Sequence, residues 1–272
     1  MMIVARARRC SCMAWLVGSV ISPSRPHSSK LADTSLEALQ ERNKQLHAEL
    51  SATPWPRLVS LTFNRQQYAL PLHAEHKAEA DLVQLSLQQL EYLAGVFDGD
   101  GCVQGRSGLS LRVSQSLDGV SMLMCMRQAL GGSIHKSRDG RGFQKPMLQW
   151  ALNGGSARHA AKILAPFSIV KRRQLELLVE WPQAHADKAD CAFRLGFLKR
   201  NEAAVPGPCS WAYFAGFFDA EGYIEQPRGK ASIVLKIAQK HPTILECLQR
   251  FLAENSVSRP RFITEVEASV TI

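Results

Sequence analysis

Two carboxylates occupy equivalent positions in a repeated nonapeptide. LAGVFDGDG spans residues 93–101 and FAGFFDAEG spans residues 214–222, so that Asp100 aligns with Glu221. If these acids end two helices that lie side by side, their charges repel each other and the negative ends of both helix dipoles. A divalent cation relieves this repulsion, and Mg²⁺ is commonly held by one or two carboxylates with carbonyl oxygens and water. The repeat therefore predicts a divalent cation, Mg²⁺ or another, held by Asp100 and Glu221.

The same nonapeptides predict the helices that position the acids. The small pairs at 94–95 and 215–216 leave a bare patch on each helix where a second helix backbone can approach closely. A glycine within a helix costs about 1 kcal/mol relative to alanine, and close packing would compensate for that cost. Gly101 and Gly222 are expected to end the two helices in the left-handed conformation that favours glycine.

The repeat continues beyond the nonapeptides. LRVSQ at 111–115 is matched by LKIAQ at 235–239, three residues further from its nonapeptide than in the first copy. Because a strand-like segment follows each predicted helix in the same order, the sequence indicates two related half-domains joined in one chain.

The two nonapeptides resemble the signature of the LAGLIDADG homing endonucleases, in the single-chain form with two motifs. The resemblance covers residues 86–272. It implies an α/β (α+β) fold of two pseudo-symmetric αββαββα half-domains, with saddle-shaped antiparallel sheets over DNA and the motif helices at the interface. It also implies that Asp100 and Glu221 are the metal ligands, whereas Asp98 and Asp219 match positions tied to the structure of the helix ends.

The resemblance assigns three further catalytic candidates. Gln115 and Gln239 match a glutamine near the hydrolytic water, and Lys171 matches a lysine that begins the last helix of a half-domain. The alternatives are strand-end amides and a solvated lysine on a helix surface. The 56-residue spacing from Gln115 to Lys171, counted from Gln239, reaches position 295, beyond Ile272. We therefore expect an incomplete second half, without closing helices and without a counterpart of Lys171.

A basic surface is expected to hold a nucleic acid. The net charge of +9 favours an anionic partner. Strand alternation separates an outward face from the core, and a β-ribbon with Arg, Lys and Gln side chains fits the major groove. The alternative is an ordinary solvated sheet face. The residues predicted to contact nucleic acid are Gln104, Arg106, Ser110, Arg112, Ser114, His135, Arg138, Arg141, Gln149, Arg228, Lys230, Ser232 and Lys236.

The domain boundaries follow from composition. Residues 1–32 lack acids and carry arginines and serines, a pattern typical of a transit peptide to a mitochondrion or chloroplast, with a secretory signal as the alternative. We expect a helical spacer and Pro-rich linker at 33–80, the first half-domain at 81–200, a linker at 201–209 and the second half-domain at 210–272. The longest apolar runs fall short of the roughly 20 residues that cross a bilayer, so no membrane partner is expected.

These features predict a monomeric, metal-dependent endonuclease that hydrolyses phosphodiester bonds in double-stranded DNA. A non-cleaving nucleic-acid binder, such as a maturase-like factor in RNA splicing, is the main alternative. An exposed apolar sheet in the second half would instead require a protein partner. The seven cysteines are scattered and contain no C-x-x-C pair, so neither a disulfide framework nor a structural zinc site is predicted.

Overall fold

The computed structural model describes residues 35–75, 84–105, 108–182, 185–226 and 234–255. The chain divides into two compact units, Met1–Leu46 and His47–Ile272, and both copies of the repeat lie in the second. Helix α1 (Leu36–Ala52) crosses the boundary and has no buried residue, as expected of a helical spacer. No helix in the described ranges combines the length and the apolar character that a membrane crossing requires.

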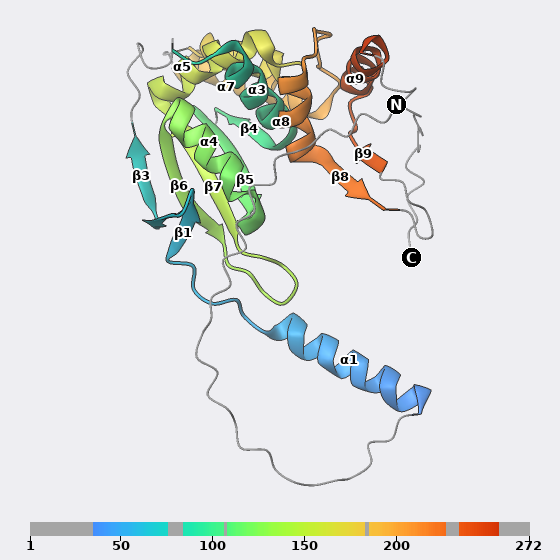
Figure 1. The fold of residues 1–272 in the computed structure, drawn as a ribbon. Helices are drawn as coiled ribbons and strands as arrows, with labels where there is room; N and C mark the ends of the chain where they lie inside the picture. Colours follow the sequence, from blue (N-terminus) through green and yellow to red (C-terminus); the bar gives the residue numbers. More distant parts are fainter. Residues whose placement is uncertain (1–34, 76–83, 106–107, 183–184, 227–233, 256–272) are drawn as a thin grey trace. The chain divides into compact units, whose positions relative to one another are not determined.

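The first copy forms the predicted order of elements. Helix α3 (Leu87–Asp100) leads into strands β4 (Gly101–Gln104) and β5 (Ser110–Ser116), and α4 (Val120–Leu130) follows. Strands β6 (Gly132–Arg138) and β7 (Met147–Asn153) and helix α5 (Gly154–Leu164) complete the αββαββα half-domain. Helices α6 (Arg172–Val179) and α7 (His185–Arg200) come after it (Figure 1). The α/β fold class expected from the sequence is thereby confirmed.

Alternation along the strands builds the core of this half. Leu111, Val113 and Trp150 are fully buried, and both α4 and α5 pack against β5 and β7. Side chains on an antiparallel sheet alternate between its faces, so the covered face is apolar and the opposite face carries the polar residues between them. The half-domain therefore keeps one sheet face available for a partner.

A segment predicted to be linker belongs to the folded unit. Residues 60–75 form strands β1 (Ser60–Phe63), β2 (Gln66–Ala69) and β3 (Leu72–Glu75). Strand β3 pairs with β6 and completes a five-stranded sheet in the order β3-β6-β7-β5-β4. Glu75 of β3 also forms a 2.8 Å ion pair with Arg127 of α4. Strand β3 thus lies before Asp81, in a segment expected to be linker, and Pro71 lies between β2 and β3 without preventing either strand.

The second copy repeats the first part of this pattern. Helix α8 (Trp211–Glu221) leads into the β8 (Gly222–Glu225) and β9 (Val234–Ile237) hairpin, and α9 (Pro242–Glu254) follows. Helix α9 has the place in the order that α4 has in the first copy. The rest of the second half, residues 256–272, lies outside the described residues, so the expected lack of closing helices stays a prediction.

Candidate metal centre and nucleic-acid interface

Helices α3 and α8 pack directly against each other through the predicted glycines (Figure 1). A Cβ built on Gly95 would overlap the carbonyl oxygen of Tyr213, and one built on Gly216 would overlap that of Tyr92. No larger residue fits either position unless the helices separate. The glycines of the two predicted patches therefore lie at the interface and set the distance between the helices, whereas Ala215 of the second patch is exposed.

The glycines after the two helices serve a different purpose from the predicted one. Gly101 has φ −72° and Gly222 has φ −90°, so both are extended and neither is left-handed. A Cβ on Gly101 would strike the carbonyl and ring of Phe97, and one on Gly222 would strike the ring of Phe218. Each helix passes into its strand without a loop, and this direct passage leaves no room for a side chain.

Two tyrosine–aspartate pairs cross the helix interface symmetrically. The Tyr92 hydroxyl donates to Asp219 at 2.8 Å, and the Tyr213 hydroxyl donates to Asp98 at 2.7 Å. Burial, followed by the charge of the partner aspartate, raises the pKa of both tyrosines, which keeps the hydroxyls as donors. These tyrosines were not among the residues predicted from the sequence, although they are separated by the same 121 residues as the acids.

Asp98 joins three parts of the first half. It is fully buried and accepts hydrogen bonds from the Ser168 hydroxyl (2.5 Å) and from the backbone N–H groups of Ile169 (2.6 Å), Val170 (3.0 Å) and Lys171 (2.9 Å), besides Tyr213. The carboxylate thus satisfies the free N–H groups that precede α6. The structural role expected for Asp98 is confirmed by these contacts.

The two predicted metal ligands each bind the predicted glutamine. Gln115 Nε2 donates to Asp100 Oδ2, and Gln239 Nε2 donates to Glu221 Oε1 at 3.1 Å. The side chain of Glu221 lies against the end of the other helix, since a Cβ on Gly99 would come within 3.0 Å of its Cγ. The structure therefore brings both acids and both glutamines to one end of the α3–α8 pair.

Lys171 lies at the same end but binds backbone oxygens. Its Nζ donates to the carbonyl oxygens of Phe97 (2.9 Å), Asp98 (2.5 Å) and Gly99 (2.8 Å) in the last turn of α3, where the Phe97 oxygen also accepts the backbone N–H of Gly101. All three ammonium protons are used in this way. Burial lowers the pKa of Lys171 to about 8, opposed by the charges of Asp98, Asp100 and Glu221. Lys171 is placed to stabilise the helix end that carries Asp100.

The electrostatics of the acids fit a cation. Burial, and then the charge of Glu221, raise the pKa of Asp100 to about 6, while Lys171 and Gln115 act in the opposite direction. Among the described residues there is no group of three or more His, Cys, Asp or Glu side chains suited to a metal. Mg²⁺ does not need such a group, because it retains several waters and binds through one or two carboxylates. The donor set of Asp100 and Glu221 fits this ion.

The predicted nucleic-acid contacts of the first half share one sheet face. Ser114 on β5 is registered with Gln149 on β7, and Gln149 with His135 on β6, so the three form a row across the sheet. Gln149 Nε2 donates to the Ser114 hydroxyl at 2.9 Å. Gln104 and Arg112 lie on the same face and are half-buried. Arg138 and Arg141 are exposed at the β6–β7 hairpin.

Ser110 and Lys236 differ from the other predicted contacts because each side chain is engaged within the protein. Ser110 is only 2% exposed and accepts from Arg112 Nε at 3.3 Å, so it supports that arginine and is not available to a partner. Lys236 is exposed and forms an ion pair with Glu225 across the β8–β9 hairpin. Arg106, Arg228, Lys230 and Ser232 lie outside the described residues.

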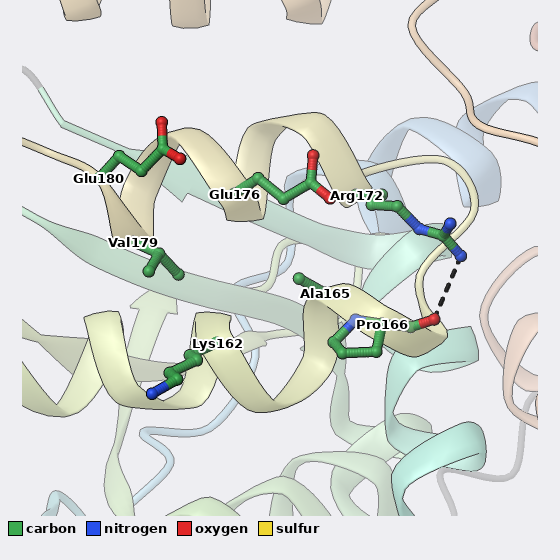
Figure 2. A pocket seen from close by; sticks show the side chains of 7 residues that line it. All are labelled: Lys162, Ala165, Pro166, Arg172, Glu176, Val179 and Glu180. Carbon is green, nitrogen blue, oxygen red and sulfur yellow. Dashed lines mark hydrogen bonds between the residues drawn. The ribbon is translucent and has the colours of Figure 1, made fainter.

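A surface hollow lies away from these groups, between α5 and α6 (Figure 2). Its lining is Lys162, Ala165, Pro166, Arg172, Glu176, Val179 and Glu180. Arg172 is engaged by the carbonyls of Ser168 (2.7 Å) and Pro166 (3.2 Å). Because its charges are mixed and none of the predicted site residues lines it, the hollow has no part in the candidate metal centre.

The comparison with known families supports the resemblance seen in the sequence. Residues 209–259 match the family of the LAGLIDADG-like domain. This segment includes the second nonapeptide and the β8–β9 hairpin. This segment is therefore similar to a LAGLIDADG-like domain, in agreement with the resemblance of the second nonapeptide. No curated protein matches the chain.

Three solved structures are similar to parts of the chain. The homing endonuclease I-CvuI in complex with its target has a TM-score of 0.34 and 22% identity, covering 47% of this chain and 89% of that chain. The LAGLIDADG meganuclease I-CpaMI bound to uncleaved DNA has a TM-score of 0.41 and 10% sequence identity. The match covers 64% of this chain and 76% of that chain. The I-LtrWI LAGLIDADG homing endonuclease bound to target DNA has a TM-score of 0.42 and 12% sequence identity. The match covers 61% of this chain and 72% of that chain.

Proposed function

We propose that this protein is a LAGLIDADG-type, site-specific endonuclease that hydrolyses phosphodiester bonds of double-stranded DNA with a divalent metal. One observation carries the proposal. Two carboxylates, Asp100 and Glu221, end two helices packed at backbone contact, and each is held by a glutamine from the following hairpin. Their mutual repulsion is costly for a purely structural arrangement, and a cation would offset it.

Asp100 and Glu221 would hold the metal, which supplies Lewis-acid stabilisation of the charge that develops on the phosphate. The glutamines fix the carboxylates through their amide N–H groups. Gln239 Oε1 also accepts from the Lys240 backbone at 2.8 Å, whereas Gln115 Oε1 accepts no hydrogen bond from another described residue. Gln115 is therefore better placed to accept a hydrogen bond from the attacking water. Lys171 keeps the end of α3 in place for Asp100.

The sheet face of the first half would lie against the DNA. Its row of Ser114, Gln149 and His135 presents hydroxyl, amide and imidazole groups, which suit hydrogen bonds to base edges. Arg138 and Arg141 on the adjoining hairpin would contact phosphates, which position the protein on the duplex. Binding is therefore expected to weaken steeply with salt, because neutralised phosphates release counterions.

Cleavage of a randomised duplex library in the presence of Mg²⁺ tests the proposal. The selected duplex is then offered to Asp100→Asn and Glu221→Gln, with Asp190→Asn as a control acid that is exposed on α7. We expect each site variant to lose at least about a hundredfold in cleavage rate while still binding the duplex. Unchanged cutting by the double variant would disprove the metal centre.

A specific asymmetry favours a second candidate, a non-cleaving or maturase-like RNA-binding factor. The described part of the second half offers no lysine to the last-turn carbonyls of α8, in contrast to Lys171 on α3. Binding of a duplex without cleavage, or binding of a structured RNA that duplex DNA fails to displace, would support this candidate. Fusion of residues 1–32 to a fluorescent protein tests the proposed organellar location separately.

A further inference from the structure

The chain that precedes the first half is bound along the tip of the β6–β7 hairpin. Trp55 N donates to the Gly140 carbonyl at 3.2 Å, and Gly142 N donates to the Thr53 carbonyl at 2.8 Å. Pro54 and Arg141 form an antiparallel β-bridge between these bonds. The Trp55 indole N–H also donates to the Gly142 carbonyl at 2.8 Å. Residues 53–55 thus lie beside the hairpin tip, held by this isolated bridge and three hydrogen bonds.

Close packing shows that this contact is specific. A Cβ on Gly140 would come within 2.6 Å of Cδ1 and Cγ of Trp55, and one on Gly142 within 2.6 Å of the Ser51 Cα. Gly142 also has φ +56°, a conformation that side-chain-bearing residues rarely adopt. The hairpin therefore uses two glycines where the preceding chain approaches it.

The element formed in this way is basic and partly aromatic on its outside. Arg57, Arg138 and Arg141 are exposed and form no ion pair with a described residue, whereas Lys136 and Lys145 are paired with Asp139 and Asp118. Phe143 is 62% exposed at the tip and lies 4.9 Å from the ring of His47. Arginines beside an exposed aromatic ring suit a phosphate backbone better than an acidic protein surface of undefined shape.

We propose that residues 53–57 form a brace, and that Trp55 is a positioning residue which holds the hairpin tip at 138–146 against the backbone of duplex DNA. The inference rests on the proposed function, since it names an additional part of the same DNA interface. Within the eight-residue loop between β6 and β7, Arg141 and Gln144 are bridged to each other, and ordering the remaining residues on binding would cost affinity. The brace removes that cost before DNA arrives, and Arg57 adds one phosphate contact from outside the repeat.

Two substitutions break the contact from opposite sides. Trp55→Ala removes the indole from the linker side, and Gly140→Ala displaces it from the hairpin side. Trp55→Phe keeps a ring over Gly140 but loses the indole hydrogen bond, so it should rescue in part. Phe193→Ala, which removes a 68% exposed ring on α7, and Arg194→Ala, which removes an exposed arginine on that helix, are matched controls for Trp55→Ala and Arg57→Ala.

The experiment measures binding of the full chain to the duplex selected by the wild-type protein, with footprinting and a salt titration. We expect Trp55→Ala and Gly140→Ala to lose about tenfold in affinity. Footprint protection of the DNA should disappear only at the outer edge of the segment bound by the first half. The melting temperature of the protein should stay within about 2 °C of wild type. Arg57→Ala should reduce the slope of the logarithm of the binding constant against the logarithm of salt concentration by about one. Both controls should bind as wild type.

The outcomes separate the two proposals. If wild-type protein binds no duplex, the proposed function fails and the inference fails with it. If wild type binds while Trp55→Ala and Gly140→Ala give the wild-type affinity and footprint, the brace is disproved and the proposed function stands. Loss of protection across the whole site would assign Trp55 to general folding and would also disprove the brace.

Discussion

The two halves share their motif helices but differ in how their sheets are covered. Val103 and Leu111 of the first half are 0% exposed, whereas the equivalent Ile224 and Leu235 are 66% and 55% exposed. Likewise Asp98 accepts five hydrogen bonds, and the described residues supply Asp219 with one, from Tyr92. The nonapeptide is therefore sufficient to build the helix interface and to place the acids. Coverage of the sheet and support of the buried aspartate come from elements beyond the motif.

The largest contrast is expected between Asp98, which is fully buried, and Asp219, which is exposed. Asp98→Ala leaves several N–H groups and a tyrosine hydroxyl without an acceptor, so we expect a loss of about 4 kcal/mol in the free energy of unfolding. Asp219→Ala removes one hydrogen bond and should cost about 1 kcal/mol. Urea unfolding of both variants measures the difference. Equal losses would show that Asp219 has partners equivalent to those of Asp98.

The next contrast concerns the sheet faces. Leu111→Ala creates a cavity in a closed core and should destabilise by about 3 kcal/mol. Leu235→Ala removes a side chain that is already in solvent, and its effect should stay within about 0.5 kcal/mol. Thermal and urea unfolding give both values. A large loss for Leu235→Ala in solution would mean that its face is covered by a partner, which size-exclusion chromatography would then reveal.

The helix interface should respond equally from both halves. Gly95→Ala and Gly216→Ala each force a methyl group against a backbone carbonyl of the opposite helix, and each should cost about 2 kcal/mol. Gly155→Ala is the control, because a Cβ there meets nothing within 4 Å. Strongly unequal losses at the two interface glycines, measured by urea unfolding, would contradict the symmetric packing.

The smallest effect should be a pH dependence carried by Asp100. Its pKa rises from 3.8 to about 6 in the folded protein, so the folded state binds the proton more tightly than the unfolded chain does. Without metal, stability is expected to fall by about 1–2 kcal/mol as the pH rises from 4 to 6. Asp100→Asn should remove this part of the pH profile of urea unfolding in EDTA, and the exposed Asp190→Asn should not. An unchanged profile in Asp100→Asn would contradict the raised pKa.

The repeat made the interface predictable because a duplicated glycine and a duplicated acid each have few structural explanations. It located the helices, the acids and the glutamines that bind them. The partners of Asp98 were not predictable, since the N–H groups at 169–171 come from a segment without any repeat in the chain. The orientation of Lys171 toward carbonyls was also missed, because the same side chain has the reach to bind backbone or solvent.

Two other errors have clear physical causes. Short strands around prolines carry little periodicity, and so 60–75 read as linker although β3 completes the sheet. Alternation alone also placed Ser110 on an open face, whereas burial depends on what covers that face, in this case the neighbouring Arg112. In both instances tertiary contacts decided what the local sequence left open.

The crossed tyrosine–aspartate pairs have a consequence for how this gene can change. Tyr92 is hydrogen-bonded to Asp219 in the other copy, and Tyr213 to Asp98, so each bond is encoded by two codons from different repeats. A harmful substitution at one codon is best compensated at its distant partner and not at the matching position of its own copy. We therefore expect selection to act on the two copies as one linked pair, which would limit how far either copy drifts alone, even though their sheets differ widely in exposure.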